Sequence, residues 1–351
     1  MTALYSQVYD FANLYQAFCQ ARRGKRDRSE VAAFEFDLEE NLLQVRQELA
    51  TCTYRPGPYR NFYVRDAKRR LVSAAPFRDR VVHHALVNVI EPLFEPRFIG
   101  DSYANRVGKG THRALERCQQ FARRYRYVLQ CDVRQFFPSV DHAILCAQLA
   151  RVIRDDEVMW LVDQILASGK GVLAGEYEMA WFPGDDLLAA TRPRGLPIGN
   201  LTSQFWANVY LNDLDQFIKR TLRCRAYLRY VDDGLFFADD KPTLHGWRGA
   251  TIERSADLRL ILHECQAQVY PVAEGIPFLG FRVFPDHRRL KSRRGHAARR
   301  RLQALARQCA AGQIDVAQLT DAVQGWVAHA AHGDTWGLRR SVLSTIVVQR
   351  R

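Results

Sequence analysis

Apolar residues in the first part of the chain recur with helical spacing. The stretches "FANLYQAFCQARRG" (11–24) and "FEFDLEENLLQVRQELA" (34–50) place them three or four positions apart, which predicts amphipathic helices over about residues 1–50. Two prolines and a glycine in "TYRPGPYR" end this pattern. The following "NFYVRDAKRRLVSAA" predicts two short strands around a basic turn.

The middle of the chain mixes the spacings of strands and helices. Strands are expected at "YVLQCDV" (127–133), in the hairpin at 226–237 and at "VYPVAEGIPFLGFRVF" (269–284). Helices are expected over 77–98, 111–125, 142–153, 155–169, 200–222 and near Ile252–His263, and the 200–222 helix has an apolar stripe that includes Phe205, Val209, Leu214 and Phe217. The segment 169–195 is polar and irregular. The pattern predicts an α+β fold, in which a central antiparallel sheet bearing helices lies between two other parts.

Composition sets the broad class. The chain has 351 residues, of which 47% are hydrophobic and 25% charged, which is ample for a large core or for two to three subdomains. No apolar run approaches the ~20 residues that span a bilayer, and the first residues lack the pattern of a signal peptide. Eight scattered cysteines without a C-x-x-C pair argue against a zinc site or a disulfide framework. A cytoplasmic protein that does not bind a membrane is expected.

The net charge of +13 is concentrated near the C-terminus. Residues 286–351 contain 13 Lys and Arg against four Asp, and "HRRLKSRRGHAARRRLQALARQ" (287–308) contains no acid. A solvated basic helix is one interpretation; a helix that binds nucleic acid is the other, because a polyanion is the natural partner of such a surface. The basic residues of this segment proposed for nucleic-acid binding are Arg293, Arg294, Arg299 and Arg300.

Three aspartates follow strands in a way that suggests a metal site. Asp232 and Asp233 lie at the tip of an apolar hairpin, and Asp132 ends the strand 127–133. If these ends meet in one sheet, the carboxylates form the oxygen-rich site that Mg²⁺ prefers; otherwise they are unrelated surface caps. The pairs Asp185–Asp186 and Asp239–Asp240 are interpreted as polar turns.

Seven stretches in order along the chain carry a resemblance to a known family. They are "KRRLVSAAPFRDRVVHHAL" (68–86), "DSYANRVGKGTHRALE" (101–116), "DVRQFFPSVDH" (132–142), "RGLPIGNLTSQFWANVYLNDLD" (194–215), "YVDD" (230–233), "GIPFLGFRV" (275–283) and "GWVAHAAHGDTWGLRR" (325–340). Together they resemble a reverse transcriptase. The resemblance implies a right-hand polymerase fold, with fingers over 1–125, a palm with the catalytic sheet over 126–285 that includes a fingers or insert return at about 140–195, and a basic helical thumb over 286–351.

The resemblance also implies roles for single residues. Asp132 and Asp232 would bridge two Mg²⁺ ions, with the Val133 carbonyl and Asp233 as further ligands. The residues implied to bind dNTP are Lys68, Arg70, Phe137, Ile198, Gly199 and Gln204, with Phe137 as the ring that excludes a ribose 2′-OH and Phe136 as a core residue. Phe278, Leu279 and Gly280 match the primer-grip hairpin. Arg78 and Arg80 touch the template or pair with Asp79.

Two departures from the common pattern concern "LPIGNLTSQ" (196–204). Ile198 and Gln204 stand where most reverse transcriptases carry glutamine and proline, and this resembles the enzymes of diversity-generating retroelements. Such an enzyme copies a template RNA into cDNA with errors at adenines, beside a small basic helical-bundle accessory variability protein. Another bacterial reverse transcriptase, phage-defence or intron-derived, and a non-catalytic RNA-binding scaffold are the alternatives. Gln266 replaces a lysine that often serves as general acid for pyrophosphate.

Overall fold

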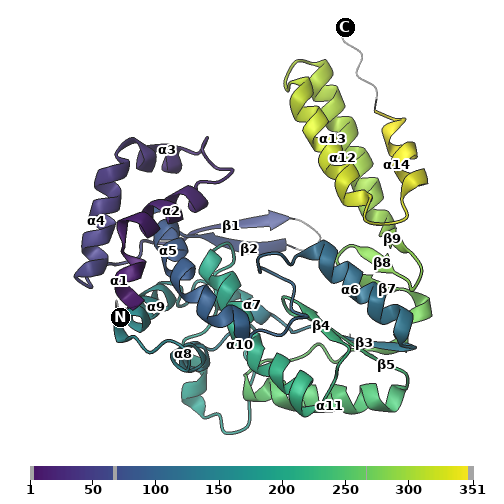
Figure 1. Ribbon diagram of the computed structural model, residues 1–351, viewed down its shortest axis with the longest axis horizontal. Coiled ribbons are helices and arrows are strands. Elements are labelled where there is room, and N and C mark those ends of the chain that lie inside the picture. Colours follow the sequence, from purple (N-terminus) through teal and green to yellow (C-terminus); the bar gives the residue numbers. More distant parts are fainter. Residues whose placement is uncertain (1–3, 66–68, 266, 347–351) are drawn as a thin grey trace.

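The structure is a computed structural model that describes residues 4–65, 69–265 and 267–346 (Figure 1). Helices at the N-terminal end form one group beside a two-stranded hairpin, and the last helices project from the opposite end of the molecule (Figure 1). The N-terminal elements are α1 (Leu4–Val8), α2 (Phe11–Ala21), α3 (Ser29–Phe36), α4 (Leu38–Ala50), β1 (Arg60–Arg65), β2 (Arg69–Ala74) and α5 (Phe77–Phe94).

Aromatic rings hold the N-terminal helices together. Asp10 caps α2 by accepting from the backbone N–H of Ala12 at 3.0 Å. Phe18 on α2 stacks on Phe34 of α3 at 5.9 Å, and Phe34 meets Phe77 of α5 edge to face at 5.3 Å. The apolar spacing in the first 50 residues therefore serves the buried contact with α5.

The central sheet has four antiparallel strands in the order β4-β5-β3-β6. Its strands are β3 (Tyr127–Cys131), β4 (Tyr227–Tyr230), β5 (Asp233–Ala238) and β6 (Val269–Pro271). The helices around it are α6 (Thr111–Arg124), α7 (Phe136–Ser139), α8 (His142–Ala150), α9 (Asp156–Ser168), α10 (Leu201–Gln216) and α11 (Lys241–Asp257).

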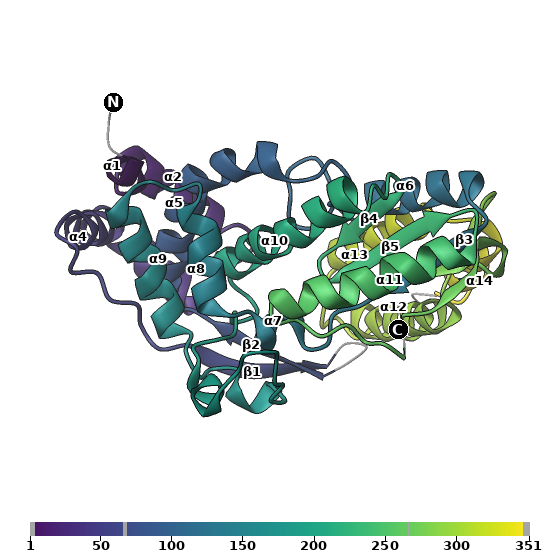
Figure 2. The ribbon, with the colours of Figure 1, turned by 90° about the horizontal axis from the view of Figure 1, so that it is seen from below.

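Both faces of this sheet are buried, and alternate residues point to opposite sides. Val128 and Leu235 pack with α6, whereas Leu129 and Phe236 belong to the larger core that includes Trp206 of α10. Figure 2 shows α11 running along the sheet, whereas α10 approaches it from the side of β4. The confirmed α+β fold thus places the ends of β3, β4 and β5 between the N-terminal helices and the C-terminal helices.

A second sheet leads into the C-terminal helices. It contains β7 (Ile276–Phe278), β8 (Phe281–Val283) and β9 (Arg288–Leu290), followed by α12 (Ser292–Ala310), α13 (Val316–Ala330) and α14 (Trp336–Leu343). His112 of α6 stacks on His332 after α13, with ring centroids 3.4 Å apart. The boundaries expected at 125 and 285 stay predictions.

Most expected elements are present, with one clear error. The helix predicted near Ile252–His263 begins at Lys241 and ends at Asp257, and Leu262 instead pairs with Val133 in an isolated antiparallel bridge. Asp240 caps this helix through Thr243 N–H at 2.8 Å, and Pro242 occupies its first turn, where proline is tolerated. Two glycines inside the helix interrupt its spacing of apolar residues, so the start of the helix was not predicted. Among the described residues, no helix is long and apolar enough to cross a membrane.

Candidate active site

Three carboxylates lie at one end of the central sheet. In the antiparallel pairing of β3 with β5, Cys131 is opposite Gly234, so Asp132, which follows Cys131, lies beside Asp233. Tyr230 pairs with Asp233, so the turn of β4 into β5 consists of Val231 and Asp232. The structure therefore brings Asp132, Asp232 and Asp233 together.

Asp232 has an unusual electrostatic environment. The pKa of its carboxyl is raised from 3.8 to about 7, mainly by burial and in addition by repulsion from Asp132 and Asp233. A backbone hydrogen bond and the Arg70 guanidinium oppose this rise. A cation between the carboxylates would remove the repulsion, because opposite charge nearby favours the ionised form.

The donor set at this edge fits Mg²⁺, which prefers carboxylate and carbonyl oxygens. The bridge between Val133 and Leu262 uses the carbonyl of Asp132, which accepts from His263 N–H at 2.9 Å, and the N–H of Arg134. Neither hydrogen bond of this bridge uses the Val133 carbonyl. Across the described part of the chain, no group of three or more His, Cys, Asp or Glu side chains is arranged tightly enough to hold a metal ion by itself.

The turn between β4 and β5 has a strained backbone. Val231 has a φ of 56°, in the left-handed region that a β-branched residue rarely adopts. Its carbonyl accepts a hydrogen bond of 2.7 Å from Nη1 of Arg229, which is buried with Asp215. Burial lowers the pKa of Arg229, but the neighbouring Asp215 carboxylate raises it, and the net result is a rise. The charge of Asp232 also contributes to the rise.

Arg70 is an exposed basic residue that acts on these carboxylates from another sheet. It lies on β2 opposite Val64, is exposed, and lowers the pKa of Asp232. A guanidinium there can bind phosphate oxygens in pairs. Lys68 and Gln266 lie outside the described residues.

The loop before α10 is fixed to β2 by backbone and amide hydrogen bonds. Ser73 N–H donates to the Ile198 carbonyl at 2.8 Å, and the Asn200 amide donates to the Ser73 carbonyl at 2.9 Å. Gly199 has a φ of 114°, and a Cβ there would lie 2.9 Å from Cγ1 of Val72. The structure therefore needs glycine at 199 to bring Ile198 beside the strand that carries Arg70.

The two phenylalanines after Asp132 have different environments. Phe136 is 2% exposed and belongs to the core, as expected. Phe137 is half-buried, meets the Phe136 ring at 5.3 Å and accepts through its carbonyl from Leu196 N–H at 2.8 Å. Gln204 is also half-buried, in the first turn of α10.

Arg78 is engaged with acidic side chains of the N-terminal part. It forms ion pairs with Glu48 and, at 3.4 Å, with Asp79. Arg80 pairs with Glu30 at 3.2 Å. The pairing with Asp79 that the sequence left open is present for Arg78, and a contact with template stays a prediction.

The predicted primer-grip residues form a tight hairpin. Phe278 is fully buried at the end of β7, and Leu279 and Gly280 make the two-residue turn into β8 with φ values of 45° and 91°. Positive φ at both turn residues matches the twist of the flanking strands. Their contact with a primer stays a prediction.

The basic residues proposed in the C-terminal part lie on α12. Arg299 donates to the carbonyl and the hydroxyl of Ser341 at 3.1 and 2.6 Å, which ties α12 to the end of α14. Arg300 is exposed. Arg293 and Arg294 lie in the first turn of α12, and only their backbone is described.

Comparisons with known proteins show the family of the chain. Residues 64–283 match the family model of the "Reverse transcriptase (RNA-dependent DNA polymerase)". The chain belongs to the reverse transcriptase family. The matched segment contains the three aspartates and Arg70 and ends with the last residue of β8.

Among curated relatives of this reverse transcriptase family, the chain is similar to the "Group II intron-encoded protein LtrA" of Lactococcus lactis subsp. cremoris. The two are 26% identical over 183 residues, 51% of this chain and 28% of that protein. "Protein YkfC" of Escherichia coli K12 is 28% identical over 181 residues, 50% of this chain and 44% of that protein. The chain spans less than half the length of these relatives.

A likeness to a solved structure is also found. An apo telomerase from Candida tropicalis, truncated from its C-terminal domain, matches with a TM-score of 0.45 and 9% identity over 70% of this chain and 59% of that chain.

Two buried ionic networks were missed by sequence reasoning. One joins Arg229 to Asp215. In the other, the side chain of Asp185, which is 2% exposed, pairs with Arg192 at 2.8 Å and with Arg259 at 2.6 Å, and Asp185 also closes the expected polar turn through its N–H, which donates to the Phe182 carbonyl at 3.0 Å. No local pattern marks either network, because Asp215 and Arg229, and likewise Asp185 and Arg259, come from different elements.

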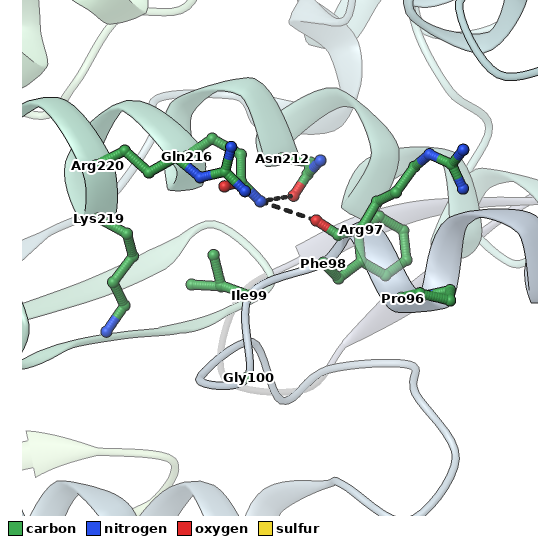
Figure 3. Close-up of a pocket in the computed structure, with 9 residues that line it drawn as sticks. All are labelled: Pro96, Arg97, Phe98, Ile99, Gly100, Asn212, Gln216, Lys219 and Arg220. Carbon is green, nitrogen blue, oxygen red and sulfur yellow. Dashed lines mark hydrogen bonds between the residues drawn. The ribbon is translucent and has the colours of Figure 1, made fainter.

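A basic groove of about 610 Å³ lies at the C-terminal end of α10 (Figure 3). Gln216 donates across it to the Arg97 carbonyl at 2.8 Å, and Lys219 and Arg220 line it from the π-helical turn η4 (Phe217–Thr221). None of the predicted site residues lines this groove.

Proposed function

We propose that this chain is an RNA-directed DNA polymerase that transfers nucleotides from dNTPs to a primer 3′-OH on an RNA template. The observation that carries the proposal is the placement of Asp132, Asp232 and Asp233 at one edge of the central sheet, within a chain of the reverse transcriptase family. Pyrophosphate is the second product.

The chain's own residues supply the metal site and the nucleotide site. Asp132 and Asp232, with Asp233 and the Val133 carbonyl, would hold two Mg²⁺ ions, which supply activation of the attacking oxygen and stabilisation of the leaving one. Arg70 faces the same carboxylates and binds the triphosphate. Phe137 lies five residues after Asp132 and excludes a ribose 2′-OH by its bulk, so dNTPs are preferred.

Nucleic acid is held by the hairpin near the end of the palm and by the C-terminal helices. The hairpin Phe278–Gly280 positions the primer end, and the basic helix α12 contacts the backbone of the duplex through residues such as Arg300. The template RNA, the cDNA or primer and dNTPs are therefore the proposed partners.

Primer extension on a defined RNA template with Mg²⁺ and dNTPs tests this proposal. The double variant Asp232→Ala with Asp233→Ala should abolish extension. The matched control is Asp186→Asn, an exposed aspartate, which should extend like the wild type. Extension that survives in the double variant, or a wild type inactive on every RNA and primer tried, would favour the RNA-binding scaffold.

The diversity-generating subtype is the finer proposal. Ile198 removes a polar group that in other enzymes sits near the incoming base, and discrimination between bases falls when hydrogen-bonding partners are lost. Copying should then produce errors concentrated at template adenines, and Ile198→Gln should reduce them. The subtype also implies the accessory variability protein as a partner.

The leading alternative is another bacterial reverse transcriptase with the same chemistry. It is favoured by the relatives, since LtrA is described as a group II intron-encoded protein. Sequencing of the extension products separates the two: a uniform, low error rate at all four template bases, with and without an accessory protein, would contradict the diversity-generating subtype and leave the polymerase intact.

A further inference from the structure

Arg229 connects the core of the molecule to the turn that carries Asp232. It lies on β4, is 2% exposed, and pairs with Asp215 of α10, which is fully buried. A buried pair of this kind adds little stability compared with apolar side chains of the same volume. Its position next to the turn therefore suggests a role beyond stability.

Every N–H of the Arg229 guanidinium has an acceptor. Nε donates to both oxygens of Asp215 at 2.9 and 3.0 Å, and Nη2 donates to Asp215 at 2.7 Å and to the Ser102 hydroxyl at 3.2 Å. Nη1 donates to Asn208 at 3.2 Å and to the Val231 carbonyl at 2.7 Å. A lysine has three donors on one point and cannot span these positions.

The backbone of Arg229 is fixed as well. Its N–H donates to the Asp101 carbonyl at 2.9 Å, and its carbonyl accepts from Tyr103 N–H at 3.0 Å. Asn208 and Asp215 lie seven residues apart, on one face of α10. The guanidinium is therefore rigid, and the Val231 carbonyl is bonded to a fixed point in the core.

Val231 needs such a bond. A β-branched residue with a φ of 56° is strained, and it keeps this conformation only when its surroundings impose it. If Val231 relaxed to negative φ, the next residue, Asp232, would turn away from Asp132.

We infer that Arg229 is a positioning residue: by holding the Val231 carbonyl, it fixes the turn conformation that aims Asp232 at Asp132. This rests on the proposed function, because Asp232 is assigned there as a metal ligand. Arg229 acts through Val231 and is not itself a catalytic residue.

The test removes the buried pair without leaving a lone charge. Arg229→Met is combined with Asp215→Asn, and the matched control is Arg22→Met with Glu35→Gln, which breaks an ion pair between the end of α2 and α3. Loss of an outer partner of a metal ligand typically costs about 10–100-fold in metal affinity or activity. The Mg²⁺ concentration that gives half of the metal-induced rise in Tm should increase by that factor in the first pair only.

Kinetics supply the second measurement. With template–primer at saturation, kcat for dNTP incorporation should fall roughly 10–100-fold in the Arg229 pair, while its Kd for template–primer stays within about twofold. Adding Val231→Gly should recover part of the lost kcat and of the lost Mg²⁺ affinity, because glycine adopts positive φ without strain.

Recovery by Val231→Gly shows whether Arg229 positions the turn or only packs in the core. A loss that Val231→Gly does not relieve, or an unchanged Mg²⁺ requirement and kcat, would overturn the inference and leave the pair a structural contact. If the wild type extends no primer but its Tm still responds to Mg²⁺, the proposed function fails. The role of Arg229 is then tested by the Tm measurements alone.

Discussion

At the scale of single residues, Asp232 links the stability of the protein to metal binding. Its pKa of about 7 in the folded chain lies above the ordinary value, so the folded state holds the proton more tightly than the unfolded chain does. The metal-free fold is therefore favoured at low pH. This contribution is lost as pH rises from about 4 to about 7.

The free energy of unfolding without Mg²⁺ should accordingly fall between pH 5 and pH 8. The contribution of Asp232 to this fall is roughly 2–3 kcal/mol, from about 1.4 kcal/mol for each pKa unit. Urea titrations at the two pH values should show a smaller fall in Asp232→Asn, whereas Asp186→Asn should behave as the wild type. An equal fall in all three proteins would mean that the Asp232 carboxyl titrates normally.

Phe137 provides a second prediction at this scale. Phe137→Val should reduce the preference for dNTP over rNTP by roughly 10–200-fold, the range in which a pocket discriminates by bulk. The ratio of kcat/KM for dGTP and GTP measures it. Phe136→Leu is the control, because this ring lies in the core: it should lower Tm and leave the ratio unchanged. A ratio that changes only in the Phe136 variant would show that Phe136, and not Phe137, excludes the ribose 2′-OH.

At the scale of elements, the irregular segment 169–194 is held by charge. Asp185 is buried between Arg192, from the segment itself, and Arg259, and Arg259 also approaches Asp141 at 3.6 Å. Asp185→Asn weakens the pairing of two half-buried arginines, which keep only longer contacts with Asp141, and should destabilise the protein by about 1–3 kcal/mol. Thermal melts should show almost no change in the neighbouring Asp186→Asn, which loses at most a cap bond to Leu188 N–H, worth about 1 kcal/mol. Similar melts for both variants would place Asp185 at the surface in solution.

The contact between β2 and the loop at 197–199 requires a residue without a side chain at Gly199. Gly199→Ala should destabilise the protein by roughly 1–3 kcal/mol, because a Cβ would strain a φ of 114° and meet Val72. It should also raise KM for dNTP, since Ile198 and Arg70 would separate. In Gly199→Ala with Val72→Ala the KM should return toward the wild-type value, because the clash is gone while the strain remains. A KM that stays at the wild-type value in the single variant would show that this loop does not contribute to dNTP binding.

Element prediction succeeded where the spacing of apolar residues was clear and failed where it was not. The helices of the first 50 residues and the strands around Asp132 and Asp232 follow directly from local patterns. Helix α11 was placed too late, because glycines at 246 and 249 dilute its pattern and its cap, Asp240, was interpreted as a turn.

At the scale of the whole molecule, the positive charge should govern binding of nucleic acid. The chain carries +13, and α12 presents Arg300 to solvent. In Arg300→Gln, the slope of log Kd for template–primer against log salt should decrease by about 0.7–0.9, the value for one released counterion. Arg46→Gln is the matched control on exposed α4 and should leave the slope unchanged. A change of equal size in both variants would show that only the total charge matters.

Long-range pairing explains what the sequence could and could not predict of the site. Asp132 and Asp232 were found because each follows a strand, and strand ends meet in a sheet. Arg229 was not singled out, since its partner Asp215 lies on a helix and nothing in either local pattern reports burial of a charge. The same holds for Asp185, whose partner Arg259 is 74 residues away.

The conformation of Val231 also has an evolutionary consequence. Glycine or asparagine would occupy this backbone position at lower cost, so selection for heat resistance alone should enrich both at 231. Where Arg229 holds the turn, selection for activity should favour a residue with a side chain, because glycine also gives the turn access to other conformations that aim Asp232 less well. Stability and turnover therefore compete at this one position, and its occupant in a laboratory population would reveal which of the two was limiting.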